Sequence, residues 1–199
     1  MKTFNDLTDI SETYLGNMEL LHILLKDHST NQNIKWATDE YYNNFKSDKY
    51  NPDGQIYPEL IINNNDRIIT PRASKTLRNR KFRTRENAEV FTPLNLVGNM
   101  NRLIFSNEIQ DIEKNDWMAL IKNKKIEITC GEGPFIVTRY DALSTKRKLI
   151  EIDKRVGFLD FKLKIISKYI NNTNDWIFWA KEAFKSSYGY DIQGDNVLL

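Results

Sequence analysis

Apolar residues recur every three or four positions in several parts of the chain, which is the spacing of one face of an α-helix. This pattern predicts helices from Asp9 to Lys26 and from Thr38 to Phe45. A further helix is expected after Thr92-Pro93, because proline is favoured in the first turn of a helix. The same spacing predicts a helix from Asp175 to Ser187, with a core-facing apolar side formed by Trp176, Trp179, Ala183 and Phe184.

Shorter apolar runs predict strands. Glu59–Ile62 and Arg67–Thr70 flank a polar loop and predict a β-hairpin. Lys125–Thr129 predicts a short buried strand, followed by a tight turn that contains Gly131 and Gly133. The apolar residues after this turn predict the start of another helix.

Composition limits the class of protein. The chain has 199 residues, 40% of them apolar and 28% charged, which is ordinary globular usage and fits one domain plus an extension that ends near Arg85. Its apolar runs are far shorter than a membrane span, and no signal segment opens the chain. The single cysteine, Cys130, excludes an internal disulfide framework and favours a reducing, cytoplasmic location. His22 and His28 form no ligand cluster with Cys130, so no metal site is expected.

The net charge of +2 does not indicate a partner, but the distribution of charge does. No acidic residue occurs from Arg67 to Arg85, and such a basic run can neutralise the phosphates of double-stranded DNA. The alternative is a solvated surface segment, which is what most charge runs are. The candidate DNA-binding residues are Arg72, Lys75, Arg78, Arg80, Lys81, Arg83 and Arg85.

An acid within a strand, followed by two glycines, is a weak indication of nucleotide binding, because glycine lets the backbone approach a ligand closely. No Lys-Ser or Lys-Thr follows Gly133, so the turn is not a phosphate-binding P-loop. The stretch resembles motif I of the amino-methylating DNA methyltransferases, Asp/Glu-Pro-x-Cys-Gly-x-Gly-x-Phe, except that Ile128 replaces the proline. The resemblance implies that the loop wraps the methionine part of S-adenosylmethionine, and that the acid orders the loop or meets the amino group. The residues implied are Glu127, Thr129, Cys130, Gly131, Gly133 and Phe135.

Two further stretches resemble motifs of the same family. Phe91, Thr92 and Pro93 match motif X, which implies that they hold the cofactor carboxylate at a helix N-terminus. Asp191 matches the acid of motif II, which closes the second strand and accepts hydrogen bonds from the ribose hydroxyls.

The ribose acid has a rival in Glu151 or Asp153. These residues end another plausible strand, nearer the usual distance of about 20 residues after the glycine loop. Asp191 is preferred because its flanking residues match the motif better.

The run from Arg85 to Leu199 resembles the modification (M) subunits of restriction endonucleases. The resemblance implies an α/β fold: a partial class I (Rossmann-like) S-adenosylmethionine-dependent methyltransferase domain over residues 86–199. A helical and β-hairpin extension, residues 1–85, would precede it. The implied activity is DNA adenine-N6 methylation in a restriction-modification system, with cytosine-N4 methylation open. The implied partners are DNA and either restriction-modification subunits or a missing C-terminal half.

The Pro-Pro-Tyr type of motif that binds the flipped base in this family is missing, because the sequence contains no adjacent prolines. No catalytic residue is therefore predicted, and the chain is expected to be truncated before the catalytic motif. Two alternatives stay open. One is a non-catalytic DNA- or partner-binding protein that derives from a methyltransferase and is encoded by a phage or mobile element. The other is a Rossmann-like domain that binds a different nucleotide.

Overall fold

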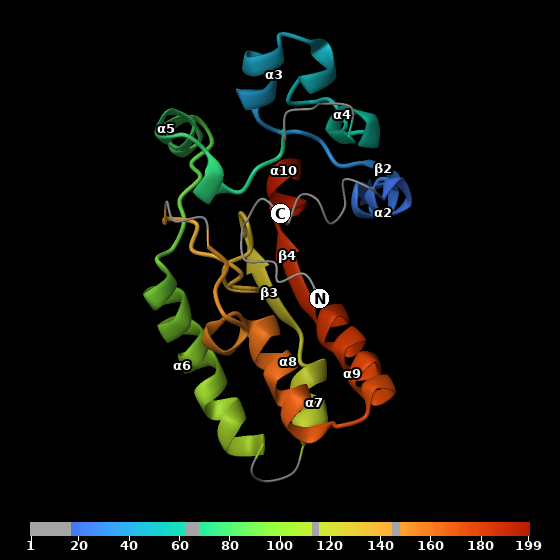
Figure 1. Cartoon of the computed structure of the whole chain (residues 1–199), viewed down its shortest axis with the longest axis vertical. Coiled ribbons are helices and arrows are strands. Elements are labelled where there is room, and N and C mark those ends of the chain that lie inside the picture. Colours follow the sequence, from blue (N-terminus) through green and yellow to red (C-terminus); the bar gives the residue numbers. More distant parts are fainter. Residues whose placement is uncertain (1–16, 63–67, 113–115, 145–147) are drawn as a thin grey trace. The chain divides into compact units, whose positions relative to one another are not determined.

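The computed structural model describes residues 17–62, 68–112, 116–144 and 148–199 (Figure 1). It is a mixture of helices and small sheets, about 52% helical. The chain divides into two compact units: Met1–Phe91, Ala142–Leu149 and Asp191–Leu199 form the first, whereas Thr92–Asp141 and Ile150–Tyr190 form the second. In the described ranges, no helix is long and apolar enough to cross a membrane.

The first unit consists of short elements. Two strands, β1 and β2, pair antiparallel. Thr38 is the N-cap of α3 and its side chain accepts a hydrogen bond from the amide of Glu40, which confirms the helix predicted to begin there. The part of the first predicted helix before residue 17 lies outside the described residues. The elements are α2 (Met18–Leu24), β1 (Lys26–Asp27), β2 (Gln32–Asn33), α3 (Asp39–Phe45), η1 (Asp48–Tyr50), α4 (Pro58–Ile62), η2 (Arg72–Ser74), α5 (Leu77–Glu86) and α10 (Gly194–Val197).

The predicted β-hairpin is wrong. Its first strand is the helix α4, and residues 68–70 form no strand. Pro58 occupies the first position of α4, where a missing amide hydrogen costs nothing. Glu59 places an acid at the positive end of the helix. A run of only a few apolar residues does not distinguish a strand from a helix, and here the start signals decide.

Aromatic rings fill the core of the first unit. The ring of Trp36 lies 4.4 Å from that of Tyr41 and 5.6 Å from that of Tyr50, measured between centroids. Leu198 joins the same cluster from the C-terminal segment. Gly194, at the start of α10, allows this approach: a Cβ there would lie 2.2 Å from the carbonyl oxygen of Lys35.

The second unit contains longer helices and a parallel pair of strands. β3 and β4 pair in the register Lys125↔Ser187 to Ile128↔Tyr190. Helices were correctly predicted after Thr92-Pro93 and around residues 175–187, as was the strand that begins at Lys125. The elements are α6 (Leu94–Ile112), α7 (Trp117–Lys122), β3 (Lys125–Ile128), η3 (Ile152–Lys154), α8 (Phe158–Tyr169), α9 (Thr173–Lys185) and β4 (Ser187–Tyr190).

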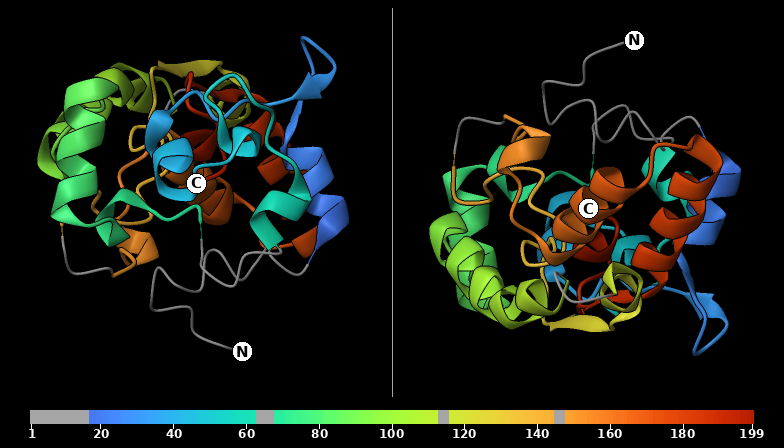
Figure 2. Two further views of the ribbon diagram at one scale, coloured as in Figure 1. Left: turned by 90° about the horizontal axis from the view of Figure 1, so that it is seen from above. Right: turned by 90° about the horizontal axis from the view of Figure 1, so that it is seen from below.

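The core of the second unit lies among its helices. Helices α8 and α9 pack side by side (Figure 1 and Figure 2). Trp117 makes an edge contact with Trp179 at 4.9 Å between ring centroids, and Trp176 also packs against the core. Phe184 is 60% exposed, so its predicted place on the buried face of α9 is wrong.

Two other predictions for this unit are corrected. β3 is not a buried strand, because Ile126 and Ile128 are more than half exposed. No helix follows Gly133; only a single turn forms, in which the amides of Ile136 and Val137 donate to the carbonyl oxygen of Gly133. The turn stops there because the carbonyl groups of Phe135 and Ile136 accept hydrogen bonds from the first turn of α8 instead.

Candidate functional site

The loop that leaves β3 has an unusual backbone. Thr129, Gly131 and Gly133 have φ values of 54°, 54° and 66°, all in the left-handed region. Glycine adopts this region without a steric penalty, but for a β-branched residue such as Thr129 it costs of the order of 1–3 kcal/mol. Such a conformation persists only where the surroundings hold it, so the contacts of this loop are informative.

The near end of the loop is fixed to β4. The amide of Cys130 donates to the carbonyl oxygen of Tyr190 at 2.9 Å, which extends the parallel ladder by one step. Gly189 of β4 lies beneath the loop: a Cβ there would be 2.6 Å from Cδ1 of Ile136 and 3.1 Å from Sγ of Cys130. The loop lies this close to β4 because residue 189 has no side chain.

Glu127 also orders the loop. Its Oε2 accepts a hydrogen bond from the amide of Ile136 at 3.2 Å. One of the two roles that the motif implies for this acid is to order the loop, and the contact supports that role. Contact of Glu127 with a cofactor amino group stays a prediction.

Helix α6 connects Thr92 and Pro93 of motif X with this loop inside the second unit. Pro93 directly precedes α6, and its carbonyl oxygen accepts from the amides of Leu96 and Val97 at 2.9 and 3.0 Å. Two turns later, Nδ2 of Asn101 donates to the carbonyl oxygen of Phe135 at 3.0 Å. The helix that begins after Thr92-Pro93 therefore packs on the loop of motif I.

The remaining predicted cofactor residues, Phe91 and Asp191, belong to the first unit. Phe91 is buried, and the guanidinium carbon of Arg72 lies 5.1 Å from its ring centroid. Asp191 directly follows β4 in the chain, and its Oδ1 accepts from the amide of Gln193 at 2.9 Å. The rival acids differ: Glu151 precedes η3 and Asp153 lies in it, so the strand expected to end at Asp153 is wrong.

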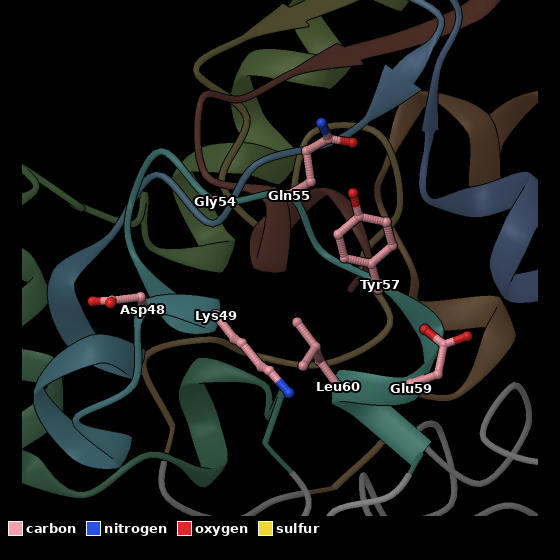
Figure 3. A pocket seen from close by; sticks show the side chains of 7 residues that line it. All are labelled: Asp48, Lys49, Gly54, Gln55, Tyr57, Glu59 and Leu60. Atoms are coloured by element: carbon pink, nitrogen blue, oxygen red, sulfur yellow. The ribbon is translucent and has the colours of Figure 1, made fainter.

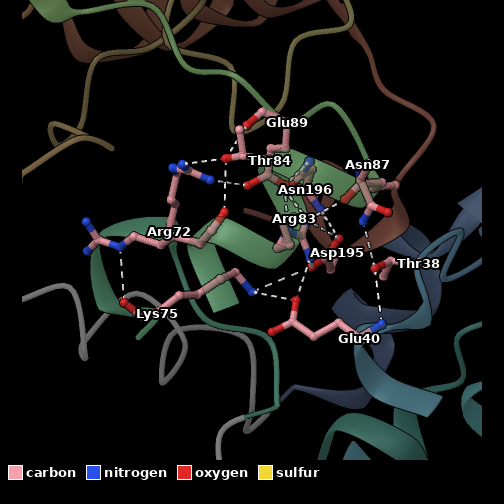
Figure 4. A network of polar contacts seen from close by, with 12 residues as sticks. Thr38, Glu40, Arg72, Lys75, Arg83, Thr84, Asn87, Glu89, Asp195 and Asn196 are labelled. Atoms are coloured by element: carbon pink, nitrogen blue, oxygen red, sulfur yellow. Dashed lines mark hydrogen bonds and ion pairs between the residues drawn. The ribbon is translucent and has the colours of Figure 1, made fainter. Parts of the chain in front are cut away.

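Part of the predicted DNA-binding stretch is buried. Arg83 of α5 is fully buried at the centre of a polar network (Figure 4). Its guanidinium contacts Glu40 at 2.9 Å, Glu89 at 2.5 Å and Asp195 at 2.6 Å. Lys75 lies 3.7 Å from the carboxylate of Glu40 and 3.8 Å from that of Asp195. Three of these five residues come from outside the basic stretch, one of them from the C-terminal segment.

The charges in this network shift the ionisation of its members. Burial opposes the charged form of Asp195, but Lys75 and Arg83 outweigh it and hold the pKa of Asp195 below its usual value. Burial and the neighbouring Asp195 raise the pKa of Tyr41, whose hydroxyl donates to Asp195 at 2.7 Å. The network is thus built for an ionised Asp195.

The predicted DNA-binding role is corrected for three residues. Arg72, Lys75 and Arg83 are buried, and their charges are directed at Glu40, Glu89 and Asp195 rather than at solvent. Spacing along the sequence gives no indication of these partners, because Asp195 lies 112 positions from Arg83. Arg80 is half-buried and donates to the carbonyl oxygens of Ala73 and Lys75. The DNA-binding role stays a prediction for the exposed residues Arg78, Lys81 and Arg85.

Several buried polar residues of the second unit were not identified from the sequence. Thr138 and Asp160 hydrogen-bond to each other beside the glycine loop. Lys162 is fully buried and donates to the carbonyl oxygen of Asn123 and to Oγ of Ser186, both at 2.7 Å. The only local signal was Gly157 three residues before Asp160, a spacing typical of a helix start.

The first unit has a separate hollow of about 380 Å³ between η1 and α4 (Figure 3). No residue predicted to bind cofactor or DNA lines it. Its lining residues are Asp48, Lys49, Gly54, Gln55, Tyr57, Glu59 and Leu60.

Within the described ranges, no group of three or more His, Cys, Asp or Glu side chains is placed to hold a metal ion. No protein-family model matches this chain, no curated protein matches it, and no solved structure matches it.

Proposed function

We propose that the second unit binds S-adenosylmethionine through the loop at residues 129–135, as the cofactor-binding portion of a DNA adenine-N6 methyltransferase of a restriction-modification system. One observation carries the proposal: the glycine loop leaves the carboxyl end of β3 beside the parallel strand β4. In open α/β sheets, ligands bind outside the carboxyl ends of the strands. The loop therefore occupies the position where such a ligand is expected.

The backbone of the loop supports the same proposal. The sign of φ is positive at Thr129, Gly131 and Gly133 and not at Cys130 or Glu132 between them. Strained backbone concentrates at ligand-binding sites. A ligand-binding role would thus explain the left-handed conformation of Thr129, which an ordinary turn does not require.

The proposed roles are those that the resemblance implies, and the chemistry of each group fits them. The N-terminus of α6, with Thr92, attracts the carboxylate of the cofactor because its amide groups carry partial positive charge. Asp191 accepts hydrogen bonds from the ribose hydroxyls. The cofactor supplies an electrophilic methyl group.

We assign no residue of this chain to the methyl transfer step. The sequence contains no adjacent prolines, so it lacks the motif that would hold the flipped base. The choice of adenine-N6 rests on the resemblance alone, and cytosine-N4 remains open.

Calorimetric titration with S-adenosylhomocysteine tests the proposal. We expect binding in the micromolar range, reduced at least tenfold by Thr92→Ala and by Asp191→Ala. Asp153→Ala is the matched control, because it removes the rival acid and should leave the affinity unchanged. A folded chain that does not bind, or a loss only in Asp153→Ala, contradicts the proposal as stated.

A second candidate function is the binding of another polypeptide, and one observation favours it. The outer face of the β3–β4 sheet consists of uncharged side chains that are 37–70% exposed: Ile126, Ile128, Tyr188 and Tyr190. Parallel sheets are normally covered on both faces, and exposed apolar patches mark interaction sites. A subunit of a restriction-modification system would cover such a face. A folded chain that binds no S-adenosylhomocysteine would favour this candidate.

A further inference from the structure

The chain that leaves the glycine loop is joined to the start of α8. The amide of Phe158 donates to the carbonyl oxygen of Phe135 at 2.8 Å, and the amide of Leu159 donates to that of Ile136 at 2.9 Å. Amides in the first turn of a helix have no partner within the helix. The end of the loop therefore supplies the acceptors that α8 needs.

A buried threonine and a buried aspartate complete this junction. Oδ2 of Asp160 accepts from the amide of Thr138 at 2.8 Å, from its Oγ1 at 3.1 Å and from the amide of Gly157 at 3.1 Å. Oγ1 of Thr138 in turn accepts from the amide of Val156 at 2.6 Å. Thr138 is fully buried and Asp160 nearly so. Hydrogen bonds to a carboxylate are about twice as strong as neutral ones, so the hydrogen bonds to Asp160 stabilise the junction.

Close packing leaves the junction little room to move. A Cβ at Gly157 would lie 2.3 Å from the carbonyl oxygen of Ile136, so the two backbones are in direct contact. Asn101 of α6 adds a third element: its Nδ2 donates to the carbonyl oxygens of Phe135 and Val156 at 3.0 and 2.9 Å. The far end of the loop is thus held by α6 and α8 together.

We propose that Thr138 and Asp160 are positioning residues for the cofactor loop. They fix its far end, whereas the hydrogen bond from Cys130 to Tyr190 fixes its near end. The left-handed Gly131 and Gly133 between these two points are then held in one conformation that a free loop would lose. This inference rests on the proposed function, and it assigns the two residues an effect on the methionine part of the cofactor without contact with it.

Thr138→Val tests the inference, because it removes the hydroxyl and keeps a similar shape. Thr173→Val at the exposed start of α9 is the matched control. We expect Thr138→Val to weaken S-adenosylhomocysteine binding at least tenfold and to leave adenosine binding within twofold, because adenosine lacks the methionine part. Thr138→Ser, which keeps the hydroxyl, should bind S-adenosylhomocysteine with the affinity of the wild type. A general folding defect would weaken both ligands alike, and that result, or no change, overturns the inference.

Amide hydrogen exchange decides the same point without a ligand. In Thr138→Val, the amides of Gly133 and Val137 should exchange at least tenfold faster, whereas those in α9 should not change. Unchanged exchange at Gly133 and Val137 overturns the inference. If the wild type binds neither ligand, the proposed function fails, but the exchange rates still test the positioning role. Should Thr138→Val not fold, Asp160→Asn, which removes the charge and keeps the size, gives the same readouts.

Discussion

Each unit of the molecule contains a fully buried cation, and the two are satisfied in opposite ways. Arg83 of the first unit contacts three carboxylates, those of Glu40, Glu89 and Asp195. Lys162 of the second unit donates to neutral oxygens. Those oxygens belong to the residues just before β3 and β4, so Lys162 holds the amino ends of the two parallel strands.

The pKa values show what the difference means. Burial disfavours both cations, but for Arg83 the attraction of Asp195 and Glu89 outweighs burial and raises its pKa. For Lys162 burial dominates, with a smaller contribution from Lys125, and lowers its pKa to about 8. The first unit is therefore held together by opposite charges from distant segments. In the second unit, the buried charge of Lys162 is unfavourable, but its ammonium group donates hydrogen bonds to backbone carbonyl groups.

The largest effect is expected from Arg83→Met. It leaves buried carboxylates without their central cation, which typically costs about 3–5 kcal/mol. Urea unfolding, followed by hydrogen exchange at Trp36 and Tyr41, should show this loss in the first unit. The control is Arg78→Met on the exposed side of α5, which should change stability by less than about 0.5 kcal/mol. Equal stability of the two variants would contradict an ionic core.

A second test compares one glycine in each unit. Gly194→Ala and Gly157→Ala would each place a Cβ within 2.3 Å of a backbone carbonyl oxygen, so each should cost about 1–3 kcal/mol through overpacking. Hydrogen exchange should become faster in the first unit for Gly194→Ala and in the second unit for Gly157→Ala. Gly98→Ala in α6 is the control of opposite sign: its Cβ would lie 3.4 Å from Val156, and alanine is the better helix former by about 0.5–1 kcal/mol.

A smaller effect is expected from Lys162→Met. It leaves the carbonyl oxygen of Asn123 without its donor, at a cost of about 1–2 kcal/mol near neutral pH. The pH dependence sharpens the test. The folded state releases the proton of Lys162 near pH 8 and the unfolded state near 10.5, so the contribution of Lys162 to stability should rise between these values. The variant lacks this contribution, so the stability of the wild type minus that of the variant should increase from pH 8 to pH 10, and a decrease would contradict the sign.

The smallest effect on folding is expected from the exposed cations of α5. Exchanging Arg78, Lys81 and Arg85 for glutamine should change stability by less than about 0.5 kcal/mol. If these residues bind phosphates, DNA affinity should fall, and the slope of log K against log salt should decrease by about 0.9 for each phosphate that is no longer neutralised. A control triple variant at Lys26, Lys46 and Lys49, also exposed, should leave the slope unchanged. An equal decrease of the slope in both triple variants would mean that α5 contributes only to the total positive charge and forms no specific DNA-binding surface.

The sequence predicted elements whose signals are local. The helix that begins near Thr38, the Thr92-Pro93 start of α6 and the strand at Lys125 were all correctly located, because each is determined by residues within one or two turns. The predicted strand before Asp191 is β4, and it pairs with the strand that leads to the glycine loop.

What the sequence did not predict depends on contacts between distant residues. The acidic partners of Arg83 come from three other segments, so the sequence of the basic stretch gave no indication that this residue is buried. The turn after Gly133 gives its carbonyl groups to α8 instead of continuing as a helix, and the residue that fixes it, Asp160, lies 22 positions from Thr138. Local propensity cannot identify such exchanges, because the competing partner is not nearby in the chain.

The contact of Arg83 with Asp195 also has a consequence for biosynthesis. The ribosome releases the chain from the N-terminus at roughly 5–20 residues per second, so the 112 positions between the two residues correspond to a delay of roughly 6–20 s. During this interval Arg83, Glu40 and Glu89 have been made, but the carboxylate that completes their charge balance has not. The second unit, whose residues lie between Thr92 and Tyr190, is fully synthesised before the first. The first unit, which is the first to be synthesised in part, is thus the last to be completed. A chaperone that delays the folding of its N-terminal part should therefore raise the yield of native protein.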